Sequence, residues 1–264
     1  MKIIVITGST RGIGLGLADA FLARNCAVVI NGRTAASVDG AVEQLAANYD
    51  RERILAHPGD VTDFDQVQAL WDAARAHFGH VDVWINSAGL AHAQTDFWQH
   101  DPAEIEAVVQ TNTIGAMYGA RVAIAGMLDQ GFGAFYNMEG LGSDGRQVEG
   151  LALYGSTKYA LSYLTDALVD QTRGSGLVVG ALRPGMVLTD LLIGQRSRDA
   201  GDWERAKKVF NLLADHVETV TPWLADQVLA NERTGVRIKW LTTWRLIGRV
   251  LAAPFRRRDL FEEE

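Results

Sequence analysis

Residues 7–14 read Thr7-Gly8-Ser9-Thr10-Arg11-Gly12-Ile13-Gly14 and join a short apolar run, residues 3–6, to a helix-length periodic segment. Glycines at positions 8, 12 and 14 allow the backbone to turn sharply and to approach a pyrophosphate. The helix that follows presents unpaired N–H groups and the positive end of its dipole to the same place. A glycine-rich turn alone could be an ordinary strand–helix connection, but its position between a strand and a helix favours dinucleotide binding by residues 8–14.

Short apolar runs alternate with helix-length segments along the rest of the chain. The predicted strands are residues 3–6, 27–30, 54–57, 81–85, 134–138, 177–182 and 235–241, and the predicted helices are 14–25, 36–49, 64–78, 102–128 and 153–172. This alternation predicts an α/β fold, a doubly wound parallel sheet of the Rossmann type with helices on both faces. We expect a single domain over residues 1–264, with a lid-like insertion at about 188–233 and a C-terminal extension at about 240–264.

The composition excludes several classes of function. The 264 residues are 48% hydrophobic, which suffices for a large core, and the net charge of -7 argues against nucleic acid as a partner. The single cysteine, Cys26, excludes an internal disulfide, and the six histidines lack ligand spacing, so no metal is expected. No apolar run is long enough to cross a bilayer, and the first strand leaves no room for a leader. We therefore expect a soluble, cytoplasmic protein.

The end of the second predicted strand indicates which dinucleotide binds. It reads Asn31-Gly32-Arg33, without the carboxylate that would accept a hydrogen bond from the ribose 2′-hydroxyl of NAD. Arg33, together with Arg11 in the first turn, instead provides two cations suited to a 2′-phosphate. The sequence therefore predicts NADPH/NADP+ as the cofactor. The alternative is that both arginines are merely solvated.

A tyrosine and a lysine share one face of the predicted helix 153–172. Tyr154 and Lys158 are four residues apart, which places them one turn from each other. A nearby ammonium favours the ionised phenol, so we expect Lys158 to lower the pKa of Tyr154 from about 10 toward a useful acid–base range. This spacing alone is common by chance.

Five motifs follow one another at suitable separations: Thr7-Gly8-x-x-x-Gly12-x-Gly14, Asn86-Ser87-Ala88-Gly89, Asn112, Tyr154-x-x-x-Lys158 and Pro184-Gly185. Together they resemble the short-chain dehydrogenase/reductase family over essentially the whole chain. The resemblance implies that Tyr154 exchanges a proton with the substrate, that Lys158 binds the nicotinamide ribose, and that Asn112 holds a water of the proton relay. It also implies cofactor contacts, from the adenine to the nicotinamide, by Asp60, Val61, Asn86, Ala88, Gly89, Pro184, Gly185, Val187 and Thr189.

One position departs from the family pattern. The family usually has a serine about thirteen residues before the tyrosine, where this chain has Gly140 or Leu141. Ser143 is the nearest hydroxyl, and we expect it to polarise the substrate carbonyl. The alternatives are that this role is weakened, or that Ser143 makes an ordinary turn hydrogen bond. Glu139, in the same loop, could orient Ser143 or be a solvated turn residue.

The loop itself resembles one branch of that family, the chlorophyll b reductases. The segments that carry the likeness are Asn137-Met138-Glu139-Gly140-Leu141-Gly142-Ser143, Tyr154-Gly155-Ser156-Thr157-Lys158 and Pro184-Gly185-Met186-Val187-Leu188-Thr189-Asp190-Leu191-Leu192. The resemblance implies NADPH-dependent reduction of the 7-formyl group of chlorophyll b or chlorophyllide b to hydroxymethyl. By analogy it also implies a homodimer or homotetramer built on the helices at 102–128 and 153–172. A reductase of another hydrophobic aldehyde, ketone, steroid or quinone, and a non-catalytic NADP(H)-binding regulator, are the alternatives.

Large apolar side chains gather in the lid and tail segments. Those of the expected lid suit a large, flat carbonyl compound as well as they suit ordinary packing: Leu191, Leu192, Ile193, Trp203, Phe210, Leu212, Leu213, Trp223 and Leu224. In the tail, residues 239–251 have an amphipathic pattern with Trp240, Trp244, Ile247 and Leu251 on one face and arginines elsewhere. This pattern fits peripheral contact with an anionic membrane, and packing on its own or a neighbouring subunit is the alternative.

Overall fold

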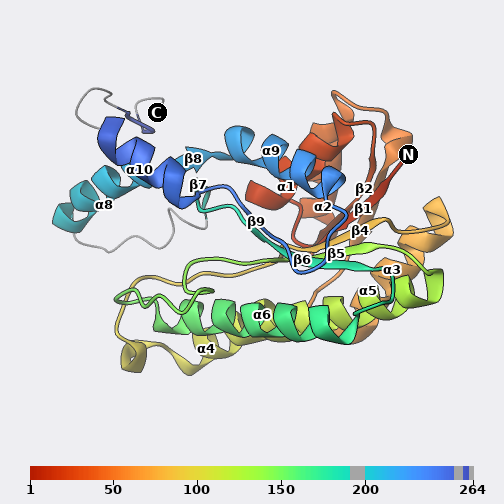
Figure 1. Ribbon diagram of the computed structural model, residues 1–264, viewed down its shortest axis with the longest axis horizontal. Helices are drawn as coiled ribbons and strands as arrows, with labels where there is room; N and C mark the ends of the chain where they lie inside the picture. Colours follow the sequence, from red (N-terminus) through yellow and green to blue (C-terminus); the bar gives the residue numbers. More distant parts are fainter. Residues whose placement is uncertain (191–199, 253–257, 262–264) are drawn as a thin grey trace.

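A computed structural model describes residues 1–190, 200–252 and 258–261, and the side chains of these residues except 200–206. Its main sheet has seven parallel strands in the order β3-β2-β1-β4-β5-β6-β9 (Figure 1). They are β1 (Ile3–Ile6), β2 (Ala27–Gly32), β3 (Ile54–Pro58), β4 (Val83–Asn86), β5 (Ala134–Met138), β6 (Val178–Arg183) and β9 (Arg237–Lys239). The chain starts at the centre, runs to one edge and returns to build the other half. This confirms the predicted Rossmann-type sheet, which binds ligands at the carboxyl ends of its strands where the order reverses.

Helices cover both faces of the sheet (Figure 1). One face carries α1 (Gly12–Leu22), α2 (Ala35–Ala46) and α9 (Val217–Ala230), and the other carries α3 (Phe64–Phe78), α4 (Pro102–Val109), α5 (Ala116–Gln130) and α6 (Ala152–Gln171). Successive strand residues point to opposite faces, so Ile4 and Ile6 pack into the first layer while Val5 packs into the second. The free thiol of Cys26 is buried in the first layer.

The predicted helix 102–128 has a different geometry in its middle. It begins as expected, because the Asp101 side chain accepts a hydrogen bond from the Ala103 N–H and Pro102 occupies the first turn. Residues Gln110–Gly115 then form a wider π-helical segment before α5 continues to Gln130. This segment carries Asn112, whose side chain is completely buried next to α6.

The chain after β6 adds a second layer beyond the carboxyl ends of the strands. β7 (Met186–Leu188) pairs in parallel with β8 (Ala214–His216), and α8 (Ala200–Leu213) and α10 (Thr243–Ala252) lie at this end of the molecule (Figure 1). No helix among the described residues is long and apolar enough to cross a membrane.

The described parts of the expected lid, residues 188–233, belong to two places: α8 and β8 lie in this outer layer, and α9 packs against the core. α9 packs against α1 so closely that a Cβ on Gly16 would lie 2.3 Å from Val217, and Leu224 is part of the core. Leu191, Leu192, Ile193 and the side chain of Trp203 lie outside the described residues.

Candidate active site

A cavity of about 690 Å³ lies at the carboxyl ends of the central strands. It brings together most of the residues for which the sequence predicts cofactor contact or catalysis. The predicted residues that line it are Gly8, Thr10, Arg11, Gly12, Ile13, Gly14, Arg33, Asp60, Val61, Ala88, Gly89, Tyr154, Lys158, Pro184, Gly185, Val187 and Thr189. Ser9, Asn86, Asn112 and Ser143 are not in its lining.

The glycine turn at the start of α1 forms one wall of the cavity. Gly8 and Gly12 have φ angles of +65° and +55°, which favour glycine. A Cβ on Gly8 would lie 2.6 Å from the Cα of Ala88, and one on Gly14 would lie 2.3 Å from the Gly8 carbonyl oxygen. The two loops after β1 and β4 can therefore approach only with glycine in these places, which leaves bare backbone facing the cavity.

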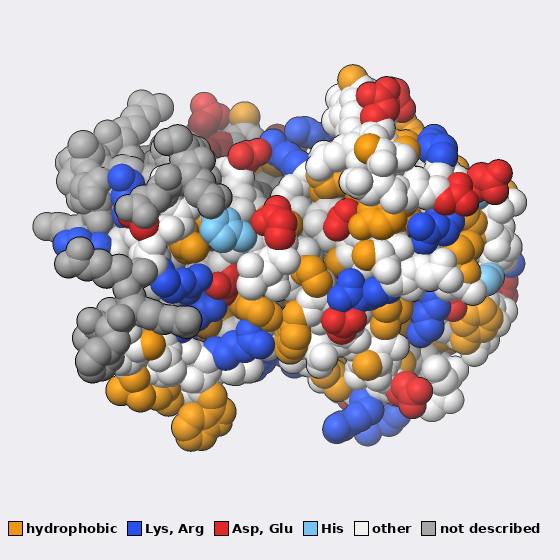
Figure 2. All heavy atoms as spheres, turned by 90° about the horizontal axis from the view of Figure 1, so that it is seen from above, with side chains coloured by type: hydrophobic (Ala, Val, Ile, Leu, Met, Phe, Trp, Pro, Cys, Tyr) orange, Lys and Arg blue, Asp and Glu red, His pale blue; other side chains and the backbone are white. Residues whose placement is uncertain are grey.

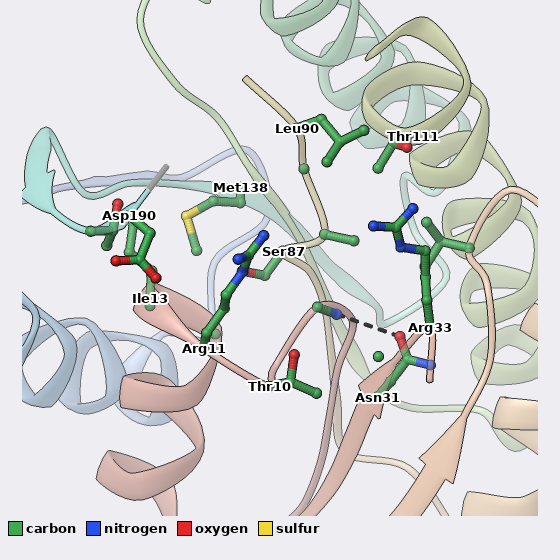
Figure 3. A pocket seen from close by; sticks show the side chains of 18 of the residues that line it. Thr10, Arg11, Ile13, Asn31, Arg33, Ser87, Leu90, Thr111, Met138 and Asp190 are labelled. Atoms are coloured by element: carbon green, nitrogen blue, oxygen red, sulfur yellow. Dashed lines mark hydrogen bonds between the residues drawn. The ribbon is translucent and has the colours of Figure 1, made fainter. Parts of the chain in front are cut away.

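Ser9 is buried beneath this turn, where its side chain makes structural hydrogen bonds. Its hydroxyl donates to the Ile6 carbonyl at 2.8 Å and accepts from the Asn31 N–H at 2.9 Å. The Asn31 side chain accepts from the Gly8 N–H at 3.4 Å, the bond drawn in Figure 3. These contacts fix the turn to the end of β2.

Two arginines line the cavity from different sides. Figure 3 shows the side chain of Arg33, which follows β2, on one side of the cavity, and that of Arg11, in the glycine turn, on the other side near Asp190. The first turn of α2 also lines the cavity through Ser37, and the Thr34 hydroxyl caps that helix by accepting from the Ser37 N–H at 3.3 Å. No acidic residue ends β2, so this region suits a phosphate.

Tyr154 and Lys158 lie one turn apart at the start of α6, and both line the cavity. The Lys158 ammonium is 5.6 Å from the centre of the Tyr154 ring and donates to the Met138 carbonyl at 3.1 Å. Burial raises the pKa of Tyr154 to about 12. Burial also lowers the pKa of Lys158 to about 8, against the opposing effect of the Glu139 carboxylate.

The direction of the Tyr154 shift differs from the sequence-based expectation. The sequence predicts that the Lys158 ammonium lowers the pKa of the phenol, but burial of Tyr154 moves this pKa upward. Tyr154 therefore keeps its proton at neutral pH. Such a phenol suits donation of a proton to an oxygen that is gaining negative charge.

Asn112 joins three parts of the site through its buried side chain. Its Oδ1 accepts from the Leu90 N–H at 2.7 Å, and its Nδ2 donates to the Leu90 carbonyl at 2.9 Å and to the Thr157 hydroxyl at 3.2 Å. The side chain thus ties the loop after β4 to α6, next to Lys158. The expected contact of Asn112 with a relay water stays a prediction.

Asn86 is buried behind the cavity, although the sequence predicts that it contacts the cofactor. Its Oδ1 accepts from the Trp84 indole N–H at 2.8 Å, and its Nδ2 donates to the Asn137 side chain at 3.0 Å. Asn137 in turn donates to the Thr165 hydroxyl on α6 at 3.0 Å. This chain of amides connects β4 and β5 to the helix that carries Tyr154.

Ser143 is buried but does not reach the cavity, whose lining includes Gly140 and Leu141 instead. Gly142, at φ +93°, turns the chain away before Ser143, and a Cβ on Gly142 would lie 2.7 Å from the Cα of Gly155. The structure therefore does not place Ser143 among the residues that line the cavity, and its contact with the substrate carbonyl stays a prediction. Gly140 packs against the Tyr154 hydroxyl in its place.

Two residues near the site have contacts that the sequence does not predict. The Glu139 carboxylate is fully buried and pairs with Arg183 and Arg237, so it neither orients Ser143 nor faces solvent. His92 is buried, and its Nε2 accepts a hydrogen bond from the Tyr154 N–H at 3.0 Å. The arginine partners of Glu139 are 44 and 98 residues away, and no spacing motif marks His92.

Comparison with known proteins agrees with this geometry. A probable chlorophyll(ide) b reductase of rice (Oryza sativa subsp. japonica), named as chloroplastic, is 34% identical over 99% of this chain and 54% of its own length. A second chloroplastic chlorophyll(ide) b reductase of rice is 35% identical over 86% of this chain and 66% of its own length. The chain thus spans between half and two thirds of the length of these relatives.

A solved structure with the same fold contains a nicotinamide dinucleotide. It is a 3-ketoacyl-(acyl-carrier-protein) reductase from Brucella melitensis complexed with NADH, with a TM-score of 0.79 and 26% identity. The match covers 90% of this chain and 96% of that one. Residues 2–200 match the sequence profile described as short chain dehydrogenase. The chain therefore belongs to the short chain dehydrogenase family of oxidoreductases.

Proposed function

We propose that this protein is an NADPH-dependent carbonyl reductase that converts the 7-formyl group of chlorophyll b or chlorophyllide b to hydroxymethyl. The observation that carries the proposal is that the phenol of Tyr154, with the Lys158 ammonium 5.6 Å from its ring centre, lines the same cavity as the glycine turn. The substrate assignment is supported by the two rice relatives and by the loop at 137–143, which resembles the same branch.

The residues that line the cavity fit a nicotinamide dinucleotide. The glycine turn offers bare backbone and the start of α1 to the pyrophosphate, and Lys158 donates from the side where the nicotinamide ribose is expected. A bound reduced nicotinamide supplies a hydride to the carbonyl carbon. Tyr154 then donates its proton to the carbonyl oxygen as charge develops there, and the nearby Lys158 ammonium stabilises the resulting phenolate.

NADPH is the proposed form of the cofactor because Arg33 and the start of α2 line the cavity where β2 ends, and Arg11 adds a second cation to its lining. A guanidinium group forms charge-assisted hydrogen bonds to a 2′-phosphate, and the N–H groups at a helix N-terminus add to them. The 2′-hydroxyl of NADH would leave both arginines without that partner.

The test is an assay of NADPH oxidation with chlorophyllide b, run beside small aldehydes, a steroid ketone and a quinone. We expect conversion of the formyl group, detected as a change in the chlorin absorption spectrum, and its loss by about a hundredfold or more in Tyr154→Phe. Tyr154→Phe should still bind NADPH. Turnover of another carbonyl compound but not of the chlorin would assign a different substrate. NADPH binding without turnover of any of these compounds would favour a non-catalytic NADP(H)-binding regulator.

We also propose contact with a membrane surface through α10. The described part of this helix has no buried side chain, and Trp244, Ile247 and Leu251 are exposed on one face. Figure 2 shows hydrophobic side chains gathered at this end of the molecule. Trp240 differs from the expectation: it is buried as part of the hydrophobic core, and its indole N–H donates to Asp215 at 2.6 Å. Flotation with anionic vesicles, compared for the protein and for Trp244→Ser, tests the contact.

The proposed assembly is a homodimer or homotetramer built on the helical stretch 102–128, which comprises α4 and most of α5, and on α6. Tyr159 and Tyr163 on α6 are 59% and 77% exposed in the single chain. Aromatic side chains are enriched at protein interfaces, so these two tyrosines support an interface on α6. Sedimentation of Tyr163→Glu should give a smaller species than the unmodified chain. Identical sedimentation of both would place any interface elsewhere. The expected cytoplasmic location differs from that of the rice relatives, which are named as chloroplastic.

A further inference from the structure

We propose that Glu139 is a positioning residue for the catalytic pair: through Arg237 it fastens the end of β5, which holds the Lys158 ammonium, to the helix that carries Tyr154 and Lys158. The inference rests on the proposed function, because it assigns a second role within the same site. It concerns a side chain for which the sequence predicts either contact with Ser143 or exposure to solvent.

The position of Glu139 in the chain places it between two contacts of the catalytic residues. The preceding residue, Met138, accepts the Lys158 ammonium at its carbonyl, at 3.1 Å. The following residue, Gly140, lies against both catalytic side chains, since a Cβ there would be 2.5 Å from the Tyr154 hydroxyl and 3.4 Å from Lys158 Cε. A shift of this segment by even a fraction of an ångström would move both contacts.

The Glu139 carboxylate is fully buried and held by two arginines from neighbouring strands. Its Oε2 accepts from Arg183 on β6, and its Oε1 accepts from Arg237 on β9 at 3.2 Å. Its N–H donates to the Leu182 carbonyl at 2.9 Å. Charge-assisted bonds from two sides hold a carboxylate far more firmly than one surface ion pair.

Arg237 carries the connection from β5 to α6. Besides Glu139, it donates to the Ser162 hydroxyl at 3.1 Å and to the Asp166 carboxylate at 2.8 Å. Ser162 and Asp166 follow Lys158 by one and two helical turns. The segment that binds the ammonium and the helix that supplies it are therefore joined by a direct link, which begins at a residue of the cavity wall, since Glu139 is among the residues that line the cavity.

The charge of Glu139 acts on Lys158 as well. Burial lowers the pKa of Lys158 to about 8, and the Glu139 carboxylate opposes this shift. Without that carboxylate, Lys158 would lie near Arg183 and Arg237 with less negative charge around it, and would lose its proton at lower pH. Replacement of Glu139 should thus have two effects, a loss of positioning and an earlier deprotonation of Lys158.

The matched pair of variants is Glu139→Gln and Asp170→Asn. Each replaces a carboxylate by its amide, but Asp170 is 71% exposed, pairs with Arg173 at the C-terminal end of α6 and takes no part in the link. We expect Glu139→Gln to lower kcat by about tenfold to a hundredfold with little change in the Kd for NADPH, and to shift the alkaline limb of the kcat profile down by about one pH unit. Asp170→Asn should stay within about threefold of the unmodified enzyme, with an unshifted profile. Equal effects of the two variants, or an unshifted profile in Glu139→Gln, would overturn the proposal.

Glu139→Asp is the rescue variant, because it keeps the charge with a shorter reach. It should restore the alkaline limb, even if its stability is lowered, and its failure to do so would also contradict the proposal. A double-mutant cycle of Glu139→Gln with Lys158→Met, measured by urea unfolding of the cofactor-free protein, needs no substrate. Coupling below pH 8 supports the link even if no carbonyl is turned over, so failure of the proposed reaction is distinguished from failure of this inference. Additive effects at every pH would refute the link.

Discussion

A Cβ built on Gly140 would lie 2.5 Å from the hydroxyl oxygen of Tyr154. The phenol therefore occupies the space into which any side chain at position 140 would extend. Real Cβ atoms do not approach another heavy atom this closely, so a larger residue must displace either the loop or the hydroxyl. Glycine at position 140 leaves room for the phenol but supplies no side-chain hydrogen-bond donor. A serine there would supply a donor only by displacing the Tyr154 hydroxyl or the loop.

Gly140→Ala should lower kcat by about a hundredfold while leaving the Kd for NADPH within about threefold. The added methyl group pushes the Tyr154 hydroxyl away from the substrate oxygen, whereas the glycine turn and Arg33 are untouched. Steady-state kinetics and fluorescence titration of NADPH measure the two quantities. Gly248→Ala is the control, because a Cβ there meets nothing within 4 Å. If Gly140→Ala keeps half or more of the original kcat, the added methyl group does not displace the Tyr154 hydroxyl and the prediction is wrong.

Ser143→Ala should change kcat by less than about fivefold. The serine is not among the residues that line the cavity, so we expect its hydroxyl to contribute little to polarising the substrate carbonyl. A loss comparable with that in Tyr154→Phe, about a hundredfold or more, would mean that the loop rearranges when substrate binds and restores the role expected from the sequence. Initial rates at saturating NADPH decide between these results.

Lys158→Met should stabilise the cofactor-free protein at pH 7, although it removes turnover. The pKa of Lys158 falls from its usual 10.5 to about 8 on folding, so the folded chain binds fewer protons than the unfolded chain between these values. Stability of the unmodified protein therefore rises with pH from about 8 to 10.5. The variant should be more stable by roughly 2 kcal/mol at pH 7, after the loss of the bond to Met138 is allowed for.

Urea unfolding at pH 7 and at pH 10.5 provides the measurement. The difference between Lys158→Met and the unmodified chain should shrink as the pH rises, because lysine becomes neutral in both states. The prediction is wrong if Lys158→Met is less stable than the unmodified chain at pH 7, or if the difference in their free energies of unfolding does not change with pH. Either result would show that neighbouring groups stabilise the buried ammonium more than its burial destabilises it.

Arg33→Ala should weaken NADPH binding by about tenfold or more and leave NADH binding nearly unchanged. The guanidinium contributes only where a 2′-phosphate is present. Isothermal titration with both nucleotides gives the ratio of the two Kd values. Arg173→Ala removes the same charge from an exposed site just after the C-terminal end of α6 and should change neither Kd. A parallel loss for NADPH and NADH in Arg33→Ala would sink the proposed preference.

Local sequence patterns predict the fold well because each βαβ unit carries its own signals. The strands at 3–6 and 134–138 and the helix at 64–78 agree with the structure to the residue. The glycine turn and the Tyr154–Lys158 spacing also depend only on neighbours in the chain. Within the described residues, what lies close in sequence around the site was therefore predictable.

Contacts between segments that are distant in the sequence could not be predicted from local patterns. The pKa of Tyr154 depends on how deeply α6 is buried, and the environment of Glu139 depends on arginines from β6 and β9. The π-helical segment that carries Asn112 is equally invisible in the pattern, since its apolar spacing is that of an ordinary helix. Trp240 and Trp244 look equivalent on a helical projection, but the strand before α10 turns one inward and leaves the other outside.

The ion pairs of two arginines in the C-terminal segment have a consequence for any contact made by α10. Arg249 and Arg258 are engaged by Asp215, and Arg245 lies over the Trp240 ring at 3.7 Å. Among the described residues, two of these cations thus already have an acidic partner, and the ridge of Trp244, Ile247 and Leu251 offers a contact mainly its apolar area. Adhesion through this ridge would persist in concentrated salt and weaken on cooling, the reverse of what an electrostatic anchor does.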